Sequence, residues 1–593
     1  MSESVRFFLM VSSIACLFLC YGSGFGAPIF YIDDGTLITI PQLALPFSLR
    51  LFRVLFTPGY HLDFYPLREW SYWLDIHFFP LLFNFGTNQR DLSIFRIHNF
   101  CLFMSSALGL FSILRFLNTT KSLSLALVIL WILNPYHYET VAWISARKDV
   151  LAMNYFIWSA VAWLKFEKTT KRQWGLLSLV LFICSLLSKT SFILCPFALL
   201  VYLISKRRFH FPFLLAGFAC CISIAWGLIQ SWHYTAALNM HFFYPWSYRI
   251  QASLAALGRM VLGVVYPEVN AIDTHNLGEW LDLNKKFLWW GLSFLSAMLG
   301  ASLLALKNTK LLLFTAFFWA TYLPISGLLF THRHFYSVRY FEPSLIVLTV
   351  GLAFSLNRWE ALIRYPIRAA FFGAFFLYFA TALFFEKNHW SSNLEIVKKA
   401  MRVTPGNVAL TTYYLTRLKD LSTQGGTSEE IGKLIKAVES SLNRQCLPEI
   451  EKAERGASTL CEVFFASGYW PQREGEAVLA AKAILDWAAK KTALSLNTSL
   501  AEARKEQWAI RLLLLNELAP PPTKIPFLLN EESRQDFLAA LHKWNPESDE
   551  YLKLQKEWEK LGVLSPGFDV LKYLQMWEKL EGLNPHVHFS KSK

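Results

Sequence analysis

The chain has 593 residues and a formal net charge of +14 at pH 7. Hydrophobic residues make up 54% of it and charged residues only 17%, against about 25% in soluble domains, which excludes an ordinary soluble enzyme and predicts a membrane protein. The basic charge does not indicate a nucleic-acid partner, because many Lys and Arg lie in short loops between apolar runs, for example 165–173 and 205–210. That placement is typical of cytoplasmic loops, and no nucleic-acid-binding motif is visible.

Apolar runs of about 20 residues, long enough to cross a membrane as helices, recur throughout residues 1–386. The sequence therefore predicts an all-α fold whose first part is a polytopic bundle of about eleven spans. The predicted spans lie near 7–29, 97–116, 122–138, 149–166, 174–188, 190–204, 211–230, 287–306, 311–330, 340–357 and 367–385. The first run is longer than a signal-peptide core and many spans follow it, so we expect it to be retained.

The charges between the runs predict which side of the membrane each loop occupies. Loops that carry Lys and Arg alternate as cytoplasmic loops, which places the N-terminus in the cytoplasm and the C-terminal part outside it. We expect an integral multi-pass protein, of the inner or plasma membrane if the source is bacterial. The predicted outer loops, rich in polar and aromatic residues, are 30–96, 134–148, 231–286 and 331–339. Residues 249–267 fit this scheme only as an interfacial, re-entrant or paired helical segment.

Residues 387–593 are far less apolar and are predicted to form a soluble, extracytoplasmic helical domain. Amphipathic helical patterns cover 428–445 and 474–496. Stacked helix pairs form extended concave surfaces, so this domain either holds an acceptor or partner or is a passive helical cap. Cys446 and Cys461 lie in it, and their spacing alone does not decide whether they are bonded.

Four sequence blocks, in a fixed order, carry a resemblance to a known family. They are IDDGTLI (32–38) with FYPLREWSYWLD (64–75) and FRIHNF (95–100), then NPYHYETVAWISARKDVLAM (134–153), LLSKTSFILCPFALLVYL (186–203) and SVRYFEPSLIVL (337–348). Together they resemble the transmembrane and tetratricopeptide-repeat O-mannosyltransferases and their protein-mannosyltransferase and bacterial relatives. That family belongs to the GT-C class of polyprenyl-phosphate-sugar glycosyltransferases. The stretch 390–418 resembles the start of its tetratricopeptide-like repeats, although no strict repeat is visible.

The resemblance implies an enzyme, an inverting glycosyltransferase that moves a hexose, for example mannose, from a polyprenyl-phosphate-linked donor. The acceptor is a hydroxyl of a protein or glycan at the outer membrane face, and no cofactor is implied. The family usually has an acid where this chain has Thr190 and Val338, so the sugar and the acceptor stay open. Two alternatives are a glycan polymerase or ligase on a similar plan, and a non-enzymatic envelope scaffold or transporter.

Asp33 and Asp34, which follow the first apolar run, are the candidate catalytic residues. Family position makes Asp33 the base, with Asp34 in support. The chemistry agrees, because an acceptor hydroxyl must lose its proton and a positioned carboxylate can take it. The competing interpretation is a turn with an acidic helix cap, since DDGT is good turn chemistry. The two acids with a nearby His could also hold a divalent cation, but no metal is assigned.

A departing lipid phosphate needs cationic donors, and the planar fork of Arg matches phosphate oxygens. The candidate phosphate-binding residues are Arg339, Lys189, Arg147 and Tyr340. A Lys between two spans, such as Lys189, is costly unless it is paired or reaches the interface. Arg339 ranks first because, in GT-C enzymes, an Arg on a late helix often meets the lipid phosphate.

Four further residues are candidates for acceptor binding or support of the site: Arg68, His137, Glu139 and His98. Arg68 either contacts acceptor or phosphate, or anchors an amphipathic interfacial helix. Glu139 either pairs with Arg147 to hold their loop, or Arg147 or Lys148 instead faces the donor phosphate. His98 and Asn99 are alternatively a brace for the start of the second span.

Overall fold

The computed structural model describes residues 21–25, 43, 45–57, 64–78, 92–233, 246–271, 281, 284–305, 308–328, 336–359 and 365–403. The chain divides into two compact units, 1–273 with 284–399 and 274–283 with 400–593. Nearly all described residues belong to the first unit. Asp33, Asp34, Cys446 and Cys461 lie outside the described residues, as does nearly all of the predicted C-terminal domain.

Every regular element in these ranges is a helix, which confirms the predicted all-α class for the described part. Four helices are long and apolar enough to cross a membrane: Ser93–Phe116, Phe211–Trp232, Lys285–Ala305 and Ala370–His389. Shorter apolar helices cover Lys121–Leu133, Arg172–Ser188, Thr190–Ser205, Leu311–Ile325 and Glu342–Asn357. The four long helices are compatible with a membrane protein, while the total of about eleven spans stays a prediction.

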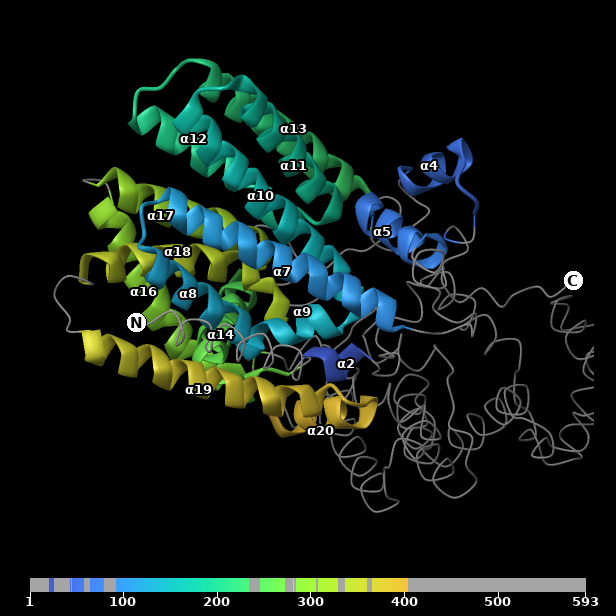
Figure 1. Ribbon diagram of the computed structural model, residues 1–593, viewed down its shortest axis with the longest axis vertical. Helices are drawn as coiled ribbons and strands as arrows, with labels where there is room; N and C mark the ends of the chain where they lie inside the picture. Colours follow the sequence, from blue (N-terminus) through green and yellow to red (C-terminus); the bar gives the residue numbers. More distant parts are fainter. Residues whose placement is uncertain are drawn as a thin grey trace, which may run out of the picture. The chain divides into compact units, whose positions relative to one another are not determined.

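The helices pack into a bundle in which sequence neighbours often lie side by side (Figure 1). In chain order they are α2 (Ser23–Phe25), α4 (Leu49–Leu55), α5 (Pro66–His77), α7 (Ser93–Phe116), α8 (Lys121–Leu133), α9 (Tyr138–Ala142), α10 (Arg147–Thr169), α11 (Arg172–Ser188), α12 (Cys195–Ser205), α13 (Phe211–Trp232), α14 (Trp246–Val265), α16 (Leu288–Ala305), α17 (Thr309–Tyr322), α18 (Glu342–Trp359), α19 (Tyr365–His389) and α20 (Asn393–Val403). The helix α10 packs against both α7 and α11, and α19 packs against α8.

The connection between α8 and α10 differs from the prediction. The span expected near 122–138 ends at Leu133, because Asn134 precedes a proline and has an extended backbone that cannot continue the helix. The chain then forms two short 3-10 helices, η3 (Pro135–His137) and η4 (Ile144–Ala146), with α9 between them. This connection is buried along almost its whole length, so its polar side chains lie inside the bundle.

The unassigned run 249–267 forms one continuous helix, α14, which rules out the paired-helix interpretation. The helices α14 and α16 touch through Gly258 and Gly291. A Cβ atom on Gly258 would lie 2.0 Å from the carbonyl oxygen of Phe287, so only glycine permits this approach. Small residues play the same role where membrane helices pack closely.

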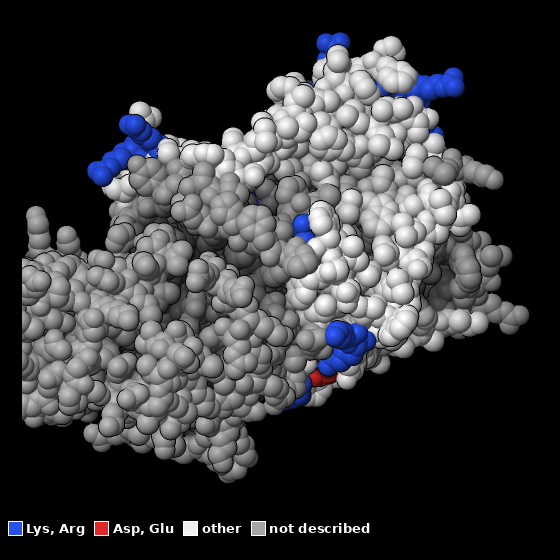
Figure 2. Space-filling view, turned by 180° about the vertical axis from the view of Figure 1, so that it is seen from behind, with Lys and Arg blue, Asp and Glu red and all other residues white. Residues whose placement is uncertain are grey.

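Much of the surface of the described bundle is apolar. Figure 2 shows a broad uncharged face on which Lys and Arg are confined to a few places. Large apolar side chains stand exposed on α13, α16 and α19, for example Phe218, Trp289 and Leu377. Soluble monomers rarely expose apolar patches this extensive, and this surface is compatible with contact with lipid.

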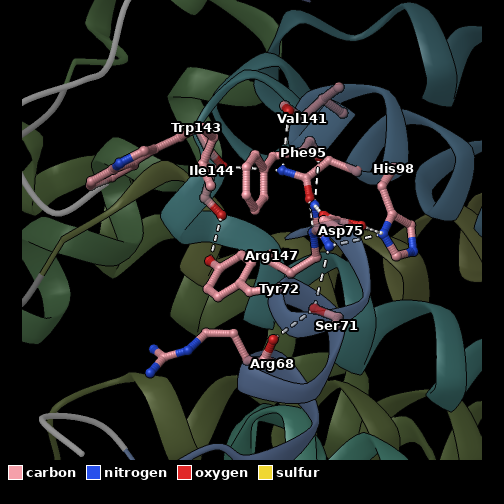
Figure 3. A network of polar contacts seen from close by, with 11 residues as sticks. Arg68, Ser71, Tyr72, Asp75, Phe95, His98, Val141, Trp143, Ile144 and Arg147 are labelled. Carbon is pink, nitrogen blue, oxygen red and sulfur yellow. Dashed lines mark hydrogen bonds and ion pairs between the residues drawn. The ribbon is translucent and has the colours of Figure 1, made fainter. Parts of the chain in front are cut away.

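A buried apolar cluster fixes α5 against α7 and the connection before α10. Its members are Leu43, Leu51, Leu55, Tyr72, Trp73, Phe95 and Ile144. Trp73 also stacks on Trp70, with ring centroids 5.1 Å apart, and its Nε1 donates to the carbonyl of Leu45 at 2.9 Å. These contacts hold α5 in place, with Ser71 and Asp75 directed toward Arg147 (Figure 3).

Candidate functional site

Arg147 is the centre of a buried polar network (Figure 3). Its guanidinium donates to Asp75 Oδ2 at 2.7 Å and to the carbonyl oxygen of Phe95 at 2.6 Å. The Arg147 network comprises Arg147, Ser71, Asp75, Phe95, His98 and Asn99, with further bonds from Arg147 to Asn99 and Ser71 and from His98 Nδ1 to Asp75. Each of the three guanidinium nitrogens of Arg147 therefore has a protein acceptor, and such multiple charge-assisted bonds hold it firmly.

Side chains of α5 and α7 also hold four successive carbonyl groups of the connection before α10, those of residues 141–144. The donors are Asn99 Nδ2 to Val141 and Trp143 at 3.3 and 3.2 Å, Arg96 to Ala142 at 2.9 Å, and Tyr72 Oη to Ile144 at 2.8 Å. Because these backbone groups are buried, each needs such a partner. The captured carbonyls set the direction in which Glu139 and Trp143 project.

A second polar cluster surrounds Asp149, in the first turn of α10. Lys189, just after α11, pairs with Asp149 Oδ1, and Arg339 of the 3-10 helix η10 (Val338–Tyr340) lies 3.5 Å from Asp149 Oδ2. Arg339 also lies 3.5 Å from Glu139 Oε1, which accepts a hydrogen bond from Ser337 Oγ at 2.9 Å. We call these five residues, Glu139, Asp149, Lys189, Ser337 and Arg339, the Asp149 cluster.

Aromatic rings lie under both cations of the Asp149 cluster. The guanidinium carbon of Arg339 is 4.1 Å from the ring centroid of Trp143, and Lys189 Nζ is 4.7 Å from that of Tyr340. A desolvated cation on a ring face gains on the order of 2 kcal/mol. The ion-pair distances of Arg339 exceed the usual hydrogen-bond length, so its carboxylate contacts are looser than those of Arg147.

Burial opposes the charged states in the Asp149 cluster. It raises the pKa of Glu139 to about 6, although Arg339 and the hydrogen bond from Ser337 act in the opposite direction. It lowers the pKa of Lys189 to about 8, although Asp149 partly restores it. At pH 7 both groups are charged at an energetic cost, and such perturbed groups are concentrated at functional sites.

An apolar groove of about 480 Å³ lies between α13, the end of α11 and the start of α5. It is lined by Phe56, Phe64, Pro66, Leu187, Trp226, Leu228, Ile229 and Trp232. Leu187 is within one turn of Lys189 in the chain. Tyr65, between two lining residues, lies under Lys148, whose Nζ is 5.5 Å from the ring centroid. Two lining segments of the groove are therefore close in the chain to Lys189 or to the ring beneath Lys148.

The structure brings together three of the four predicted phosphate-binding residues, Arg339, Lys189 and Tyr340, from two distant segments. Arg147 does not join them, because its guanidinium is committed to Asp75 and its neighbours, and we assign it to support of the site. Of the two interpretations of this segment, the ion pair between Glu139 and Arg147 is not the one that the structure shows. Glu139 pairs with Arg339 instead, because the turn of η4 directs Arg147 toward α5 and α7.

Arg68 and His98 hold supporting positions. Arg68 is fully buried and its Nε donates to Glu69 Oε1 at 3.0 Å, while its guanidinium points away from Arg147 (Figure 3). His98, with Asn99, braces the first turns of α7 through the Arg147 network. An acceptor role for Arg68 stays a prediction.

His137 lies in a separate buried contact. Its Nδ1 is 3.1 Å from Glu342 Oε1, which also accepts from Thr140 Oγ1 at 2.5 Å. This pair ties η3 to the first turn of α18. Within the described residues no group of three or more His, Cys, Asp or Glu side chains is placed to hold a metal ion.

Sequence reasoning missed three residues that organise the two clusters, namely Asp75, Trp143 and Asp149. Asp149 had a usable signal, because a carboxylate in the first turn of a span needs a cationic partner. Asp75 also had one, since it shares a face of α5 with Ser71, one turn earlier. Trp143 had no such signal in the sequence, because its role depends on the tertiary contact that places Arg339 over its ring.

The chain matches no family model, no curated protein and no solved structure. The resemblance to GT-C enzymes therefore has only the four sequence blocks behind it. What the geometry adds is the convergence of these blocks: residues of the second, third and fourth meet at Asp149.

Proposed function

We propose that this chain is an inverting membrane glycosyltransferase of the GT-C type, which transfers a hexose from a polyprenyl phosphate to a hydroxyl of a protein or glycan. The observation that carries the proposal is the convergence of Arg339, Lys189 and Tyr340 around Asp149. An apolar groove, whose lining includes Leu187, two residues before Lys189, supports it. A lipid-linked sugar phosphate has a charged head and a long apolar chain, and the two features suit these two parts.

Arg339 and Lys189 supply the positive charge that the leaving group requires. An acceptor oxygen attacks the anomeric carbon, the bond from that carbon to the phosphate oxygen breaks, and its electron pair stays on the phosphate. Cations already fixed in a buried site stabilise this charge more strongly than water does. The phosphate replaces the carboxylates around Arg339, whose contacts are already 3.5 Å long, while Asp149 keeps Lys189 in place.

The groove accounts for the lipid part of the donor. Its lining side chains are all apolar, and burying each CH₂ group of a prenyl chain contributes about 0.8 kcal/mol. With the first isoprene units between α11 and α13, the phosphate reaches Lys148 and Lys189 at the inner end.

The finer topology is part of the same proposal: about eleven spans, a cytoplasmic N-terminus and an extracytoplasmic C-terminal domain. The resemblance implies Asp33, supported by Asp34, as the acceptor base, and both acids lie outside the described residues. A reporter enzyme fused after residue 386 should be active only on the outer face. A cytoplasmic signal from that fusion would contradict the arrangement.

The function can be tested with the purified full-length chain in lipid nanodiscs and a panel of radiolabelled polyprenyl-phosphate hexoses. We expect saturable binding of at least one donor, and transfer of its hexose to a protein or glycan in envelope extract. Arg339→Ala should weaken donor binding about 10–100-fold and lower transfer with it. Arg208→Ala, which removes a half-exposed cation that pairs with Glu167, should change neither. Consumption of an oligosaccharide-diphosphate lipid instead would indicate a ligase, and no donor binding at all would favour a scaffold or transporter.

A further inference from the structure

Glu139 also lines a second cavity, which is distinct from the apolar groove and has both polar and apolar walls. The cavity has a volume of about 20 Å³, enough for one water molecule or one hydroxyl group. Its polar lining residues are Tyr136, Glu139, Asn270, Glu386, His389 and Lys399. They come from η3, α9, the segment after η7 (Pro267–Val269), α19 and α20, so the cavity is built from five separate elements.

Tyr136 gives this cavity an unsatisfied hydrogen-bonding group. Its side chain is fully buried, and its Oη has no hydrogen-bond partner among the described residues. An unpaired buried hydroxyl costs about 1–3 kcal/mol, so an oxygen that enters the cavity gains a bond there. Glu386 and Lys399 already pair with each other, which leaves Tyr136 and Glu139 as the lining groups best suited to an incoming oxygen.

Glu139 belongs to both the cavity and the Asp149 cluster. Its Oε1 accepts from Ser337 and lies 3.5 Å from Arg339, whose charge holds the pKa of the buried carboxyl down. When Arg339 turns to a phosphate, part of this effect is neutralised. Glu139 then becomes a stronger base while the donor is bound.

We propose that this cavity binds the acceptor oxygen and that Glu139 takes its proton. The inference rests on the proposed function and deepens it. The oxygen, held by Tyr136 Oη, bonds to the anomeric carbon while its proton passes to the Glu139 carboxylate. The bond from that carbon to the phosphate oxygen breaks, and its electron pair stays on the phosphate beside Arg339 and Lys189. Glu139 thereby takes over the proton-accepting role that the sequence predicts for Asp33.

Water fits the same cavity, so slow hydrolysis of the donor is expected when no acceptor is present. Glu139 must be ionised to take a proton, so kcat/KM for the donor falls as the pH drops through about 6, the pKa of its carboxyl before the donor binds. The charged and titratable groups around it are Arg339, Asp149, Glu342, Tyr136, Glu386, His389 and Lys399.

The test uses the full-length chain, radiolabelled polyprenyl-phosphate hexose and water as the acceptor. Release of free hexose measures turnover, and lipid retained on the protein measures binding. Glu139→Gln should lower turnover about 100-fold or more, weaken binding far less, and remove the acid limb near pH 6. Added formate should restore part of the turnover of Glu139→Ala, which a purely structural role would not allow. Glu167→Gln, in the Arg208 ion pair, is the matched control and should behave as wild type.

Unchanged turnover and an unchanged acid limb in Glu139→Gln would overturn the inference and leave the proposed function standing. Weaker binding with normal turnover at saturating donor would also overturn it, as would loss of the acid limb in Asp33→Asn alone. If Glu139→Gln does not fold, Tyr136→Phe tests the same cavity. We expect about tenfold lower turnover with the acid limb retained, corresponding to one lost hydrogen bond, and unchanged turnover would refute the role. A wild-type chain that neither binds nor consumes any donor would refute the proposed function itself.

Discussion

The Arg147 network and the Asp149 cluster lie at the same end of α10 and use the same residue types, yet they hold their cations differently. Arg147 has a carboxylate, a carbonyl, an amide and a hydroxyl at hydrogen-bond distance. Arg339 faces two carboxylates at 3.5 Å and an indole ring. The partners of Arg147 lie at hydrogen-bond distance, whereas the two carboxylate contacts of Arg339 are longer.

This difference indicates which cation is structural and which can meet a ligand. A guanidinium that satisfies all its neighbours must lose several bonds to bind a phosphate, so Arg147 has little to gain from one. When Arg339 binds a phosphate, shorter charge-assisted hydrogen bonds replace its ion-pair contacts of 3.5 Å, and its interaction energy becomes more favourable. Perturbed groups with displaceable partners are therefore a better guide to the site than charge alone.

The largest effect on stability is expected when the carboxylate of the Arg147 network is removed. Asp75→Asn leaves a buried guanidinium without its counter-ion, which should lower the free energy of unfolding by about 3–5 kcal/mol. Thermal unfolding of the purified chain, followed by tryptophan fluorescence, measures this. The matched control is Arg208→Ala, which breaks a half-exposed ion pair and should cost about 0–1 kcal/mol. Equal midpoints for the two variants would show that the network does not anchor the fold.

The corresponding change in the Asp149 cluster should affect binding more than folding. Arg339→Ala removes charge-assisted bonds to the phosphate, so affinity for polyprenyl phosphate should fall about 10–100-fold. In this variant Asp149 is still paired with Lys189, and Glu139 still accepts the hydrogen bond from Ser337. The unfolding midpoint should therefore fall less than in Asp75→Asn. Arg339→Lys keeps the charge without the planar fork and should give an intermediate affinity. A large loss of stability with normal affinity in Arg339→Ala would show that the Asp149 cluster is structural and does not bind the phosphate.

The helical class could be predicted from the sequence because long apolar runs leave few other folds in a membrane. The run 211–230, for example, forms α13 at Phe211–Trp232 with almost the same limits. The end of α8 was missed although Asn134 and Pro135 signal it, because apolar and aromatic residues continue beyond the helix.

The partners of the charged residues could not be predicted in the same way. Glu139 and Arg147 lie in one short connection, and their separation along the chain suits an ion pair as well as any other arrangement. Their directions depend on the carbonyl groups captured by Asn99, Arg96 and Tyr72, which are tertiary contacts. Arg339 reaches Glu139 because η10 packs against α9 and η3, another tertiary contact.

When Lys189 loses its proton, donor binding and the stability of the protein should change in opposite directions. Burial lowers its pKa to about 8, so donor binding should weaken as the pH rises through 8 and the ammonium group loses its charge. The unfolded chain has the ordinary, higher pKa and keeps its proton, so the contribution of Lys189 to stability increases over the same range. Lys189→Arg should abolish this alkaline loss of binding. Binding and stability that decline together above pH 8 would point to general unfolding instead.

The smallest expected effect concerns the ring beneath Arg339. Trp143→Leu removes a cation–π contact worth about 0.5–2 kcal/mol, so affinity for polyprenyl phosphate should fall a few-fold to tenfold. Trp143→Phe keeps a ring face and should lose less. Trp289→Leu is the control, because that indole is 72% exposed on the apolar surface and should leave affinity unchanged. If Trp143→Leu and Trp143→Phe lose affinity equally, the indole acts through packing against Trp390, 6.3 Å away between ring centroids, rather than through the charge of Arg339.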